Sequence, residues 1–427
     1  MNIHIHTFGC KLNQYESEKI SFELKNMGAN ITELKNADAI AINTCTVTND
    51  SDKKLINYLD KLENISQKKI FLIGCYVSKK ENIIKENSKE ENLFDKENIT
   101  IIPNDKKEEA SQIIFNTLTK NYESEFKNPI FFPQEQSRAY LKIQDGCEVF
   151  CSYCIVARVR GKHKSVEPKK IYDAIKIAYE YGYKEIVLTG LNLGSYNYNN
   201  EIKFIQIVKN MLEISSKFGI RIRLSSIEPI YFNDELISLF KNSEVLCPHA
   251  HIPLQSGSDK ILKLMNRRYT RENYLNIVEK LYKTNSNIGI SADIMVGFPN
   301  EDSNDFKDTY NLCEKSKFIK MHIFRYSNRE NTPSSKMSNQ IGYRTKLKRA
   351  KLLNELNNKM KDNFYKNAIN RELKVIAEKK LENNYYIGTS GEYLKVKSEK
   401  IIEKKDIIKV KAIKYEDNII IGEAKNG

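Results

Sequence analysis

The feature that most constrains this chain is the stretch GCEVFCSYC at residues 146–154. It places Cys147, Cys151 and Cys154 in a CxxxCxxC pattern, between a strand-like run and a basic run. Three thiolates on one short loop can ligate three irons of a 4Fe–4S cube and leave the fourth iron open to a small molecule. The spacing differs from paired CxxC zinc sites and from the CxxCxxC run of ferredoxins. The alternative is that these are structural cysteines in a buried loop.

Length and composition limit the remaining possibilities. The 427 residues are enough for several domains, and 40% hydrophobic content can form a sizeable core. The sequence has no apolar run of about eighteen residues and no basic-then-apolar leader, so we expect a cytoplasmic chain with no membrane partner. In that reducing compartment the eight cysteines indicate metal ligands or core thiols rather than disulfides. A net charge of +14 favours a polyanionic partner.

Strand and helix patterns alternate through residues 1–120. We expect strands at 2–8, 39–43, 69–74 and 100–103, and helices at 14–27 and around 55–62. This alternation predicts a parallel sheet covered by helices, an α/β domain.

The other cysteines recur in phase with those strands. Cys10, Cys45 and Cys75 each follow a strand closely, about one strand–helix–strand unit apart. Parallel strands place such residues at one edge of the sheet, so three more thiolates are expected to lie together and hold a second cluster. Taken singly, each is better explained as a buried core thiol. Cys247 and Cys313 lack partners at ligand spacing and are predicted to be core thiols.

A linker is predicted at 121–137, where two prolines occur without periodicity. The domain predicted at 138–368 contains six strand patterns separated by helices, at 139–144, 185–190, 220–226, 249–255, 290–298 and 320–327. Six such units form an incomplete (β/α)6 barrel, whose ligands bind at the carboxyl ends of the strands.

Those ends carry ligand-like residues. Gly190 permits close backbone approach, Asn192 offers a donor and an acceptor, and Arg325 and Arg329 can reach a carboxylate. Each motif alone is also explained as a simple turn after a strand.

The C-terminal part changes character twice. Residues 344–367 predict one long helix, and the stretch 344–368 holds eight basic and two acidic side chains, which suits either solvent exposure or a row of phosphates. Residues 369–427 alternate with a period of two and predict a small antiparallel β-barrel of about five strands. Tyr385, Tyr386 and Tyr393 there are candidates for stacking on bases or for core packing.

The CxxxCxxC loop resembles that of the radical S-adenosylmethionine (SAM) superfamily, in which the open iron chelates SAM. The segments TFGCKLNQYESE, NTCTVTN and GCY are similar to the N-terminal domain of the methylthiotransferases, and the resemblance covers essentially the whole chain. It implies two 4Fe–4S clusters, one on Cys147, Cys151 and Cys154 and an auxiliary one on Cys10, Cys45 and Cys75. It also implies SAM contacts from the central region: Tyr153, Gly190, Asn192, Ser225, Gln255 and Arg325.

The resemblance implies the activity as well. In this family SAM serves both as methyl donor and as source of a 5′-deoxyadenosyl radical, and no side chain acts as a general base. The C-terminal barrel resembles the RNA-binding TRAM domain. Expected partners are therefore the tRNA anticodon stem-loop, a sulfur donor and an electron donor such as flavodoxin or ferredoxin.

The motifs GCKLNQYE and NTCTVTN most resemble the branch that methylthiolates threonylcarbamoyladenosine beside the anticodon. The alternatives are isopentenyladenosine in tRNA, a ribosomal protein, or a non-catalytic tRNA-binding iron–sulfur sensor. The sequence departs from the family where Lys162 and Lys164 replace arginines and Asn331 replaces a glycine. These departures concern substrate contacts rather than the clusters.

Overall fold

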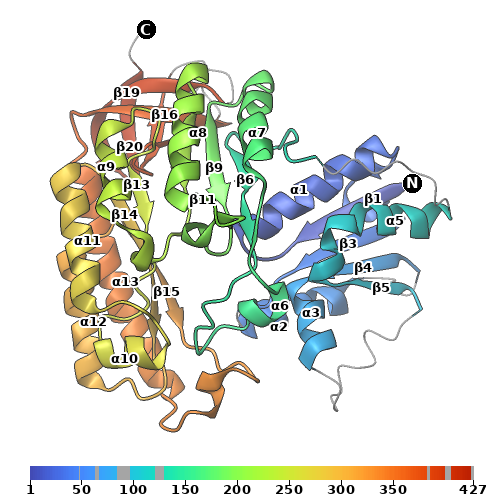
Figure 1. The fold of residues 1–427 in the computed structure, drawn as a ribbon, viewed down its shortest axis with the longest axis horizontal. Helices are drawn as coiled ribbons and strands as arrows, with labels where there is room; N and C mark the ends of the chain where they lie inside the picture. The colour runs from blue at the N-terminus through green and yellow to red at the C-terminus, as the bar shows by residue number, and fades with distance from the viewer. Residues whose placement is uncertain are drawn as a thin grey trace. The chain divides into compact units, whose positions relative to one another are not determined.

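The structure is a computed structural model that describes residues 1–47, 49–62, 67–83, 97–120, 129–381, 385–399 and 405–424. The chain separates into two compact units, whose elements are labelled in Figure 1. Unit 1 comprises Met1–Pro133, Asp145–Lys164 and Ser327–Ser335; unit 2 comprises Gln134–Gln144, Ser165–Tyr326 and Lys336–Gly427. Both predicted cysteine sets therefore belong to unit 1. The domain limits expected at residues 120, 138 and 368 stay predictions, and 121–128 of the expected linker lie outside the described residues.

Unit 1 contains a five-stranded sheet in the order β2-β1-β3-β4-β5, with every pairing parallel. Its strands are β1 (Asn2–Thr7), β2 (Asn30–Ile31), β3 (Ala39–Thr44), β4 (Lys69–Gly74) and β5 (Ile99–Ile102). The parallel α/β prediction is confirmed. Sequence patterning missed β2, because two residues are too few to show a period.

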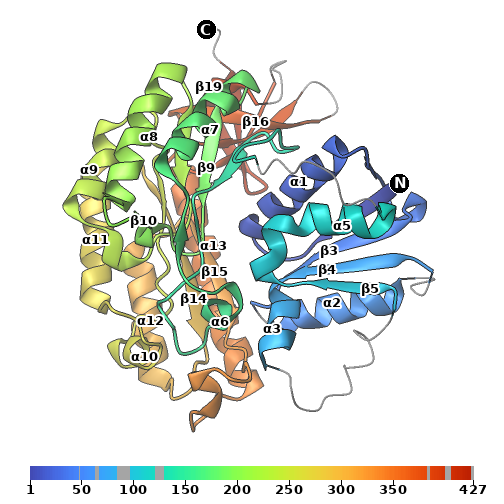
Figure 2. The ribbon, with the colours of Figure 1, turned by 45° about the vertical axis from the view of Figure 1, so that its right-hand side comes forward.

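Helices cover both faces of this sheet (Figure 2). On one face α1 (Lys11–Asn26) and α5 (Ala110–Thr119) pack Leu24 and Ile114 against strand residues such as Phe71. On the other face α2 (Asn49–Lys61) and α3 (Cys75–Ile83) pack Leu55 and Tyr76 against the opposite side of the strands. Alternate strand residues thus enter two different cores, which is why the central strands β3 and β4 are largely apolar. Short 3₁₀ helices occupy η1 (Leu34–Asn36) and η2 (Asn104–Glu109).

The strands of the larger part of unit 2 form two parallel three-stranded sheets, β12-β9-β6 and β13-β14-β15. Their bounds are β6 (Ala139–Lys142), β9 (Glu185–Thr189), β12 (Arg221–Leu224), β13 (His249–His251), β14 (Gly289–Val296) and β15 (Lys320–Arg325). Isolated parallel bridges join β12 to the segment of β13, at Ile222–Leu246 and Ser226–His251. Among the described residues no pairing joins β6 to β15, so the barrel is incomplete, as predicted.

Helices lie along the outside of these strands (Figure 1). They are α7 (Pro168–Glu180), α8 (Phe204–Phe218), α9 (Asp234–Asn242), α11 (Arg271–Thr284), α12 (Ser303–Ser316) and α13 (Tyr343–Lys366), with the shorter α10 (Asp259–Leu264) in a connection. Pro168 begins α7 as predicted, because its missing N–H costs nothing at the first helical position. The short elements β7 (Gln144–Asp145), β8 (Lys164–Ser165), β10 (Asn197–Tyr198), β11 (Ile202–Lys203), α6 (Val156–Arg160) and turns η3 (Leu193–Ser195), η4 (Pro229–Tyr231) and η5 (Pro333–Lys336) lie in loops.

The end of the chain forms a closed five-stranded barrel, as predicted. Its strands are β16 (Glu372–Lys380), β17 (Tyr386–Ser390), β18 (Lys395–Ser398), β19 (Ile407–Glu416) and β20 (Ile419–Ala424). One feature differs from the prediction: β18 and β20 pair in parallel, so the barrel is not wholly antiparallel. The parallel pair closes the barrel, and no sequence pattern distinguishes it from an antiparallel pair.

A buried charge network joins this small barrel to the larger one. Arg221 and Arg223 at the start of β12 both donate to the carboxylate of Glu185. Arg221 also donates to the carbonyl oxygens of Lys374 and Thr389, and Arg223 to those of Ser390 and Gly391. Burial alone would raise the pKa of Glu185, but the nearby arginines, Arg221 foremost, lower it to about 2. The small barrel is therefore hydrogen-bonded to the amino-terminal ends of the larger barrel's strands.

The basic helix predicted at 344–367 is α13. Leu353, Leu356 and Met360 are buried on its predicted apolar stripe. No helix in the described part of the chain is long and apolar enough to cross a membrane.

Candidate functional site

The three N-terminal cysteines lie at the carboxyl ends of adjacent strands. Cys10 precedes the first turn of α1, Cys45 directly follows β3, and Cys75 begins α3 directly after β4. Cys45 and Cys75 are buried and Cys10 is exposed. Burial is the largest cause raising the pKa of the Cys45 thiol, and the charges of Cys10 and Cys75 raise it further. The three sulfurs are therefore close enough to interact electrostatically.

Two residues of the N-terminal motif hold these loops. Gly9 has a φ of +106°, and a Cβ there would lie 2.8 Å from Cys45 Sγ. The site thus requires glycine for both conformation and space. Asn13, which is buried, donates to the carbonyl oxygens of Phe8 (2.8 Å) and Thr44 (2.9 Å). One amide thereby joins the loops that carry Cys10 and Cys45, which explains the polar residues of GCKLN physically.

Backbone hydrogen bonds contribute to holding the CxxxCxxC loop. Cys147 donates its N–H to the carbonyl of Gly161 (3.2 Å), and Cys154 donates to that of Cys151 (3.0 Å). The Val156 N–H lies 3.4 Å from Cys154 Sγ and donates to it. Burial and then the Cys151 charge raise the pKa of the Cys154 thiol to about 12. A strong Lewis acid such as iron is needed to displace this proton at neutral pH.

Arg160 links the two cysteine sets within unit 1. It ends α6, which begins just after Cys154, and its Nε donates to Cys75 Sγ at 3.2 Å. Its other nitrogens donate to Glu16 and Asn13 of α1 and to Asp145. Although burial opposes its charge, Cys75 and then Glu16 raise the pKa of Arg160 further above its usual value. The sequence showed only a basic run here and gave no sign of this role.

The predicted SAM contacts in unit 2 follow the ends of the barrel strands. Gly190 comes directly after β9, and a Cβ there would lie 2.9 Å from Gln144 Oε1. Gln144 Oε1 also accepts the N–H of Asn192 at 2.8 Å. Asn192 is buried, yet its side-chain Oδ1 has no hydrogen-bond partner among the described residues. A buried acceptor left open in this way fits a ligand that donates a hydrogen bond.

Three other predicted contacts have different settings. Ser225 follows β12 directly and is partly buried. Gln255 adopts a φ of +62° and forms an isolated bridge with Ile294 of β14. Arg325 ends β15, where its guanidinium lies 5.2 Å from the ring centre of Tyr343. Tyr153 belongs to unit 1 with the CxxxCxxC loop.

The expectation for Arg329 was wrong. This residue is not a free carboxylate receptor, because it is buried in unit 1 and donates to Asp52 at 2.7 Å. It also donates to Thr46 and Asn49, which flank the Cys45 loop. Its partners precede it by about 280 residues, so the sequence offered no signal for the pairing.

Sequence reasoning also missed a polar cluster on β13, β14 and β15. His251 Nε2 lies 3.2 Å from Asp293 Oδ2, and His322 contributes a third nitrogen within 4.8 Å of both. His251 Nδ1 lies 2.9 Å from Ser291 Oγ. Burial would raise the pKa of Asp293, but the hydrogen bond from His251 lowers it, so the carboxylate is ionised at neutral pH.

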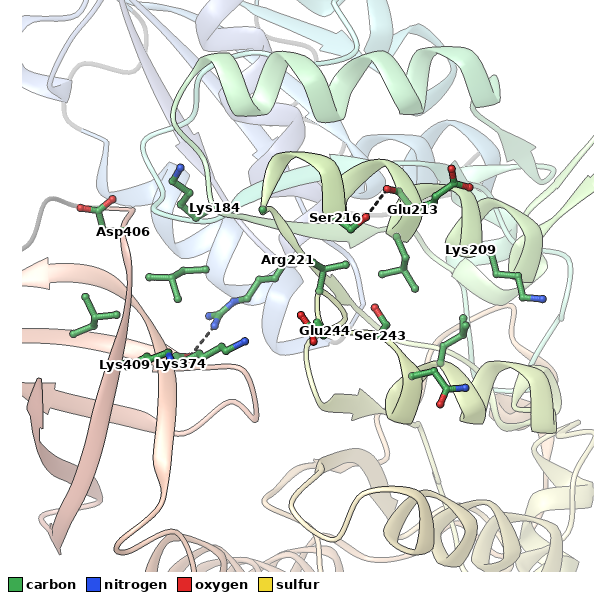
Figure 3. Close-up of a pocket in the computed structure, with 17 residues that line it drawn as sticks. Lys184, Lys209, Glu213, Ser216, Arg221, Ser243, Glu244, Lys374, Asp406 and Lys409 are labelled. Carbon is green, nitrogen blue, oxygen red and sulfur yellow. Dashed lines mark hydrogen bonds between the residues drawn. The ribbon is translucent and has the colours of Figure 1, made fainter. Parts of the chain in front are cut away.

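A pocket of about 990 Å³ lies at the other end of these strands (Figure 3). Its lining combines lysines and acids from the larger barrel with strands of the small barrel, including Lys184, Glu213, Lys374 and Lys409. The side chain of Arg221 also lies at this pocket, and it donates a hydrogen bond to the carbonyl oxygen of Lys374 (Figure 3). Within unit 2, the pocket thus lies at the opposite ends of the strands from the predicted SAM contacts Gly190 and Ser225.

The candidate RNA surface contains fewer free groups than the sequence suggested. On α13, Arg349 is buried against Glu301, while Arg344, Lys348, Lys351, Lys359 and Lys366 are exposed. Tyr386 is buried, and Tyr393 stacks on His249 with ring centres 4.6 Å apart. These two tyrosines pack within unit 2, and Tyr385 is only partly buried.

The residues present fit iron–sulfur clusters and SAM. None of the eight cysteines forms a disulfide, and six of them lie in two sets. A hydrogen-bond donor lies near a sulfur of each set, at Cys154 and at Cys75. Cys247 and Cys313 are buried, as expected of core thiols. Asn192 provides the open acceptor that a bound SAM can satisfy. The arrangement can therefore bind two clusters through three thiolates each.

Comparison with known proteins agrees with this reading. Residues 141–313 match the radical SAM superfamily, and residues 2–96 match the uncharacterized protein family UPF0004. Among solved structures, the radical SAM methyltransferase TsrM from Kitasatospora setae has a TM-score of 0.57 at 9% identity, covering 78% of this chain and 76% of that chain. The fold and the CxxxCxxC loop thus define a radical SAM enzyme.

Curated relatives narrow the class. The chain is 34% identical over 386 residues to threonylcarbamoyladenosine tRNA methylthiotransferase MtaB of Thermotoga maritima, covering 88% of this chain and 86% of the relative. It is 36% identical over 389 residues to tRNA-2-methylthio-N(6)-dimethylallyladenosine synthase of Clostridium tetani, covering 88% and 84%. The chain belongs to the radical SAM methylthiotransferase family, whose cofactors are SAM and two 4Fe–4S clusters.

Proposed function

We propose that this enzyme methylthiolates threonylcarbamoyladenosine next to the anticodon of tRNA. The observation that carries the proposal is the pair of cysteine sets in unit 1, joined by Arg160 and matched over most of the chain by relatives that act on tRNA adenosines. Cys147, Cys151 and Cys154 hold the SAM cluster, and Cys10, Cys45 and Cys75 hold the auxiliary cluster. When bound, these groups supply the deoxyadenosyl radical, the sulfur and the methyl group.

The protein residues bind, orient and shield. Tyr153, Gly190, Asn192, Ser225 and Gln255 are proposed SAM contacts, with the open Oδ1 of Asn192 as acceptor. The basic side of α13 and the small barrel are proposed to bind the tRNA backbone. An electron donor and a sulfur donor complete the reaction, which we place in the cytoplasm.

Relatives of both tRNA branches match this chain, so the choice of substrate needs its own argument. The motifs GCKLNQYE and NTCTVTN favour the threonylcarbamoyl branch. Arg325 gives a second argument, because a partly buried guanidinium at the end of β15 can bind a carboxylate. The threonylcarbamoyl group has a carboxylate and the dimethylallyl group has none. SAM also has one, so binding of SAM to R325Q shows which carboxylate is bound.

The test is mass spectrometry of nucleosides in tRNA from cells with and without the gene. We expect the methylthio form of threonylcarbamoyladenosine to disappear without it and to return on complementation. Loss of the methylthio dimethylallyl nucleoside instead would assign the enzyme to the second branch. If both persist and a ribosomal protein loses mass, tRNA is not the substrate.

A further inference from the structure

Arg160 occupies an unusual position for a charged side chain. Only 3% of its side chain is exposed, and it lies at the end of α6, the helix that follows the CxxxCxxC loop. A buried guanidinium is costly unless its N–H groups are paired. The groups that Arg160 contacts therefore indicate which part of the site its positive charge stabilises.

The partners fix the plane of the guanidinium. Nη1 lies 2.6 Å from Glu16 Oε1 and 3.3 Å from Asp145 Oδ2, while Nη2 lies 2.8 Å from Asn13 Oδ1 and 3.1 Å from Glu16 Oε2. Lys107 lies 2.5 Å from the same Glu16 Oε2 as an ion-pair partner. Because the guanidinium is rigid and planar, these bonds leave Nε a single direction.

That direction leads to Cys75. Arg160 Nε lies 3.2 Å from Cys75 Sγ, and Ile155 and Val159 of the same segment pack against Cys75 in one apolar cluster. Asn104 donates to the Val159 carbonyl at 2.7 Å and holds the end of α6 in place. The sulfur thus receives a charged hydrogen bond in a site with little water.

Such a bond has a known electrostatic consequence. Reduction adds negative charge to an iron–sulfur cluster, and hydrogen bonds and positive charge near the ligand sulfur stabilise the reduced state. The effect is large where burial lowers the dielectric screening.

We propose that Arg160 is a positioning residue that holds Cys75 and raises the reduction potential of the auxiliary cluster. This inference rests on the proposed function, since it requires a cluster on Cys10, Cys45 and Cys75. The helix α6, which follows the CxxxCxxC loop, would thus supply a positive charge beside the N-terminal cysteine set.

The experiment isolates the auxiliary cluster in the full-length variant C147A/C151A/C154A. After anaerobic reconstitution, its midpoint potential is measured by EPR-monitored titration, with and without R160M. R160M removes the donor and the charge, so at a fixed potential we expect the ratio of oxidised to reduced cluster to rise about tenfold, a fall of about 59 mV for a one-electron couple. R160K keeps the charge without the fork and should give an intermediate value.

The matched control is R349M. Arg349 lies on α13 and, like Arg160, is a buried arginine that is paired with a glutamate, Glu301. R349M should lower the melting temperature and leave the potential unchanged. An unchanged potential in R160M with iron retained would overturn the inference, as would iron loss from R160M and R160K alike in a folded chain. Absence of iron from the C147A/C151A/C154A parent would instead overturn the proposed auxiliary cluster itself.

Discussion

At the scale of single residues, the two cysteine sets are held in different ways. The N-terminal set is held by side-chain contacts from Asn13 and Arg160, whereas backbone hydrogen bonds hold the CxxxCxxC loop, including one from the distant Ser334 to the carbonyl of Ser152. Gly146 illustrates the second case, since a Cβ there would lie 2.0 Å from the Lys162 carbonyl oxygen. Each set is therefore expected to load iron without the other.

This independence gives the first prediction. The variant C10A/C45A/C75A should retain about four irons per chain and still cleave SAM, whereas C147A/C151A/C154A should retain about four irons and cleave none. Iron analysis and quantitation of 5′-deoxyadenosine measure both properties. Loss of SAM cleavage from the first variant would contradict the division of roles.

The second prediction concerns Asn192, whose buried side-chain Oδ1 accepts no hydrogen bond from the described residues. N192A should weaken SAM binding to the reconstituted enzyme by about 1–3 kcal/mol, roughly 5- to 150-fold in Kd. Equilibrium dialysis measures this, with N197A as the control because Asn197 is exposed and bonds to Asn200. Equal affinities in the two variants would remove Asn192 from the SAM site.

At the scale of residues, the sequence predicted those site residues whose pattern depends on nearby positions in the chain. The six cysteines were predictable because their spacing, and their phase with the strands, can be read directly. Arg160 and Arg329 were not, since Glu16 precedes Arg160 by 144 residues and Asp52 precedes Arg329 by 277. A basic residue in sequence gives no sign of being buried against a distant acid.

At the scale of elements, the periodic patterns were sufficient for the long strands and helices. The apolar stripe of α13 and the six barrel strands confirm this. The misses, β2 and the parallel β18–β20 pair, involve a strand too short for a period and a pairing that only closure determines.

The third prediction tests the network that joins β9, β12 and the small barrel. E185Q leaves the two buried guanidiniums of Arg221 and Arg223 without their charge partner and should destabilise the fold by about 3–5 kcal/mol. Denaturant unfolding measures this loss. E180Q, at the exposed last residue of α7, is the control and should change stability little.

The same network has a defined pH dependence. The pKa of Glu185 in the folded state, about 2, lies below its usual value of 4.5, so its contribution to stability is complete above pH 4.5. That contribution is lost as the pH falls through 2. The stability difference between wild type and E185Q should therefore shrink in that window, and a constant difference would show that the charge of Glu185 does not contribute to stability.

At the scale of the whole molecule, the small barrel is a structural part of unit 2. Its backbone oxygens accept hydrogen bonds from Arg221 and Arg223, and a chain ending at residue 368 would lack these acceptors. If the small barrel were deleted, a loss of RNA binding could therefore not be distinguished from a loss of folding. Charge reversals on the surface separate the two.

The fourth prediction uses such a reversal. K348E/K351E on exposed positions of α13 should weaken tRNA binding and reduce the slope of log affinity against log salt by about 1 for each phosphate that is no longer bound. Filter binding across a salt series measures it, with K169E/K176E on α7 as the control. An unchanged slope would remove α13 from the RNA surface.

The most direct test of the account combines both cofactor sites with the substrate. Reduced, reconstituted enzyme is incubated with SAM, sulfide and an equal mixture of tRNAs that carry threonylcarbamoyladenosine or dimethylallyladenosine. The nucleosides are then identified and quantified by mass spectrometry. The account predicts a methylthio product from the threonylcarbamoyl nucleoside alone, and none from C10A/C45A/C75A although that variant still forms 5′-deoxyadenosine. A methylthio product from that variant would contradict the account.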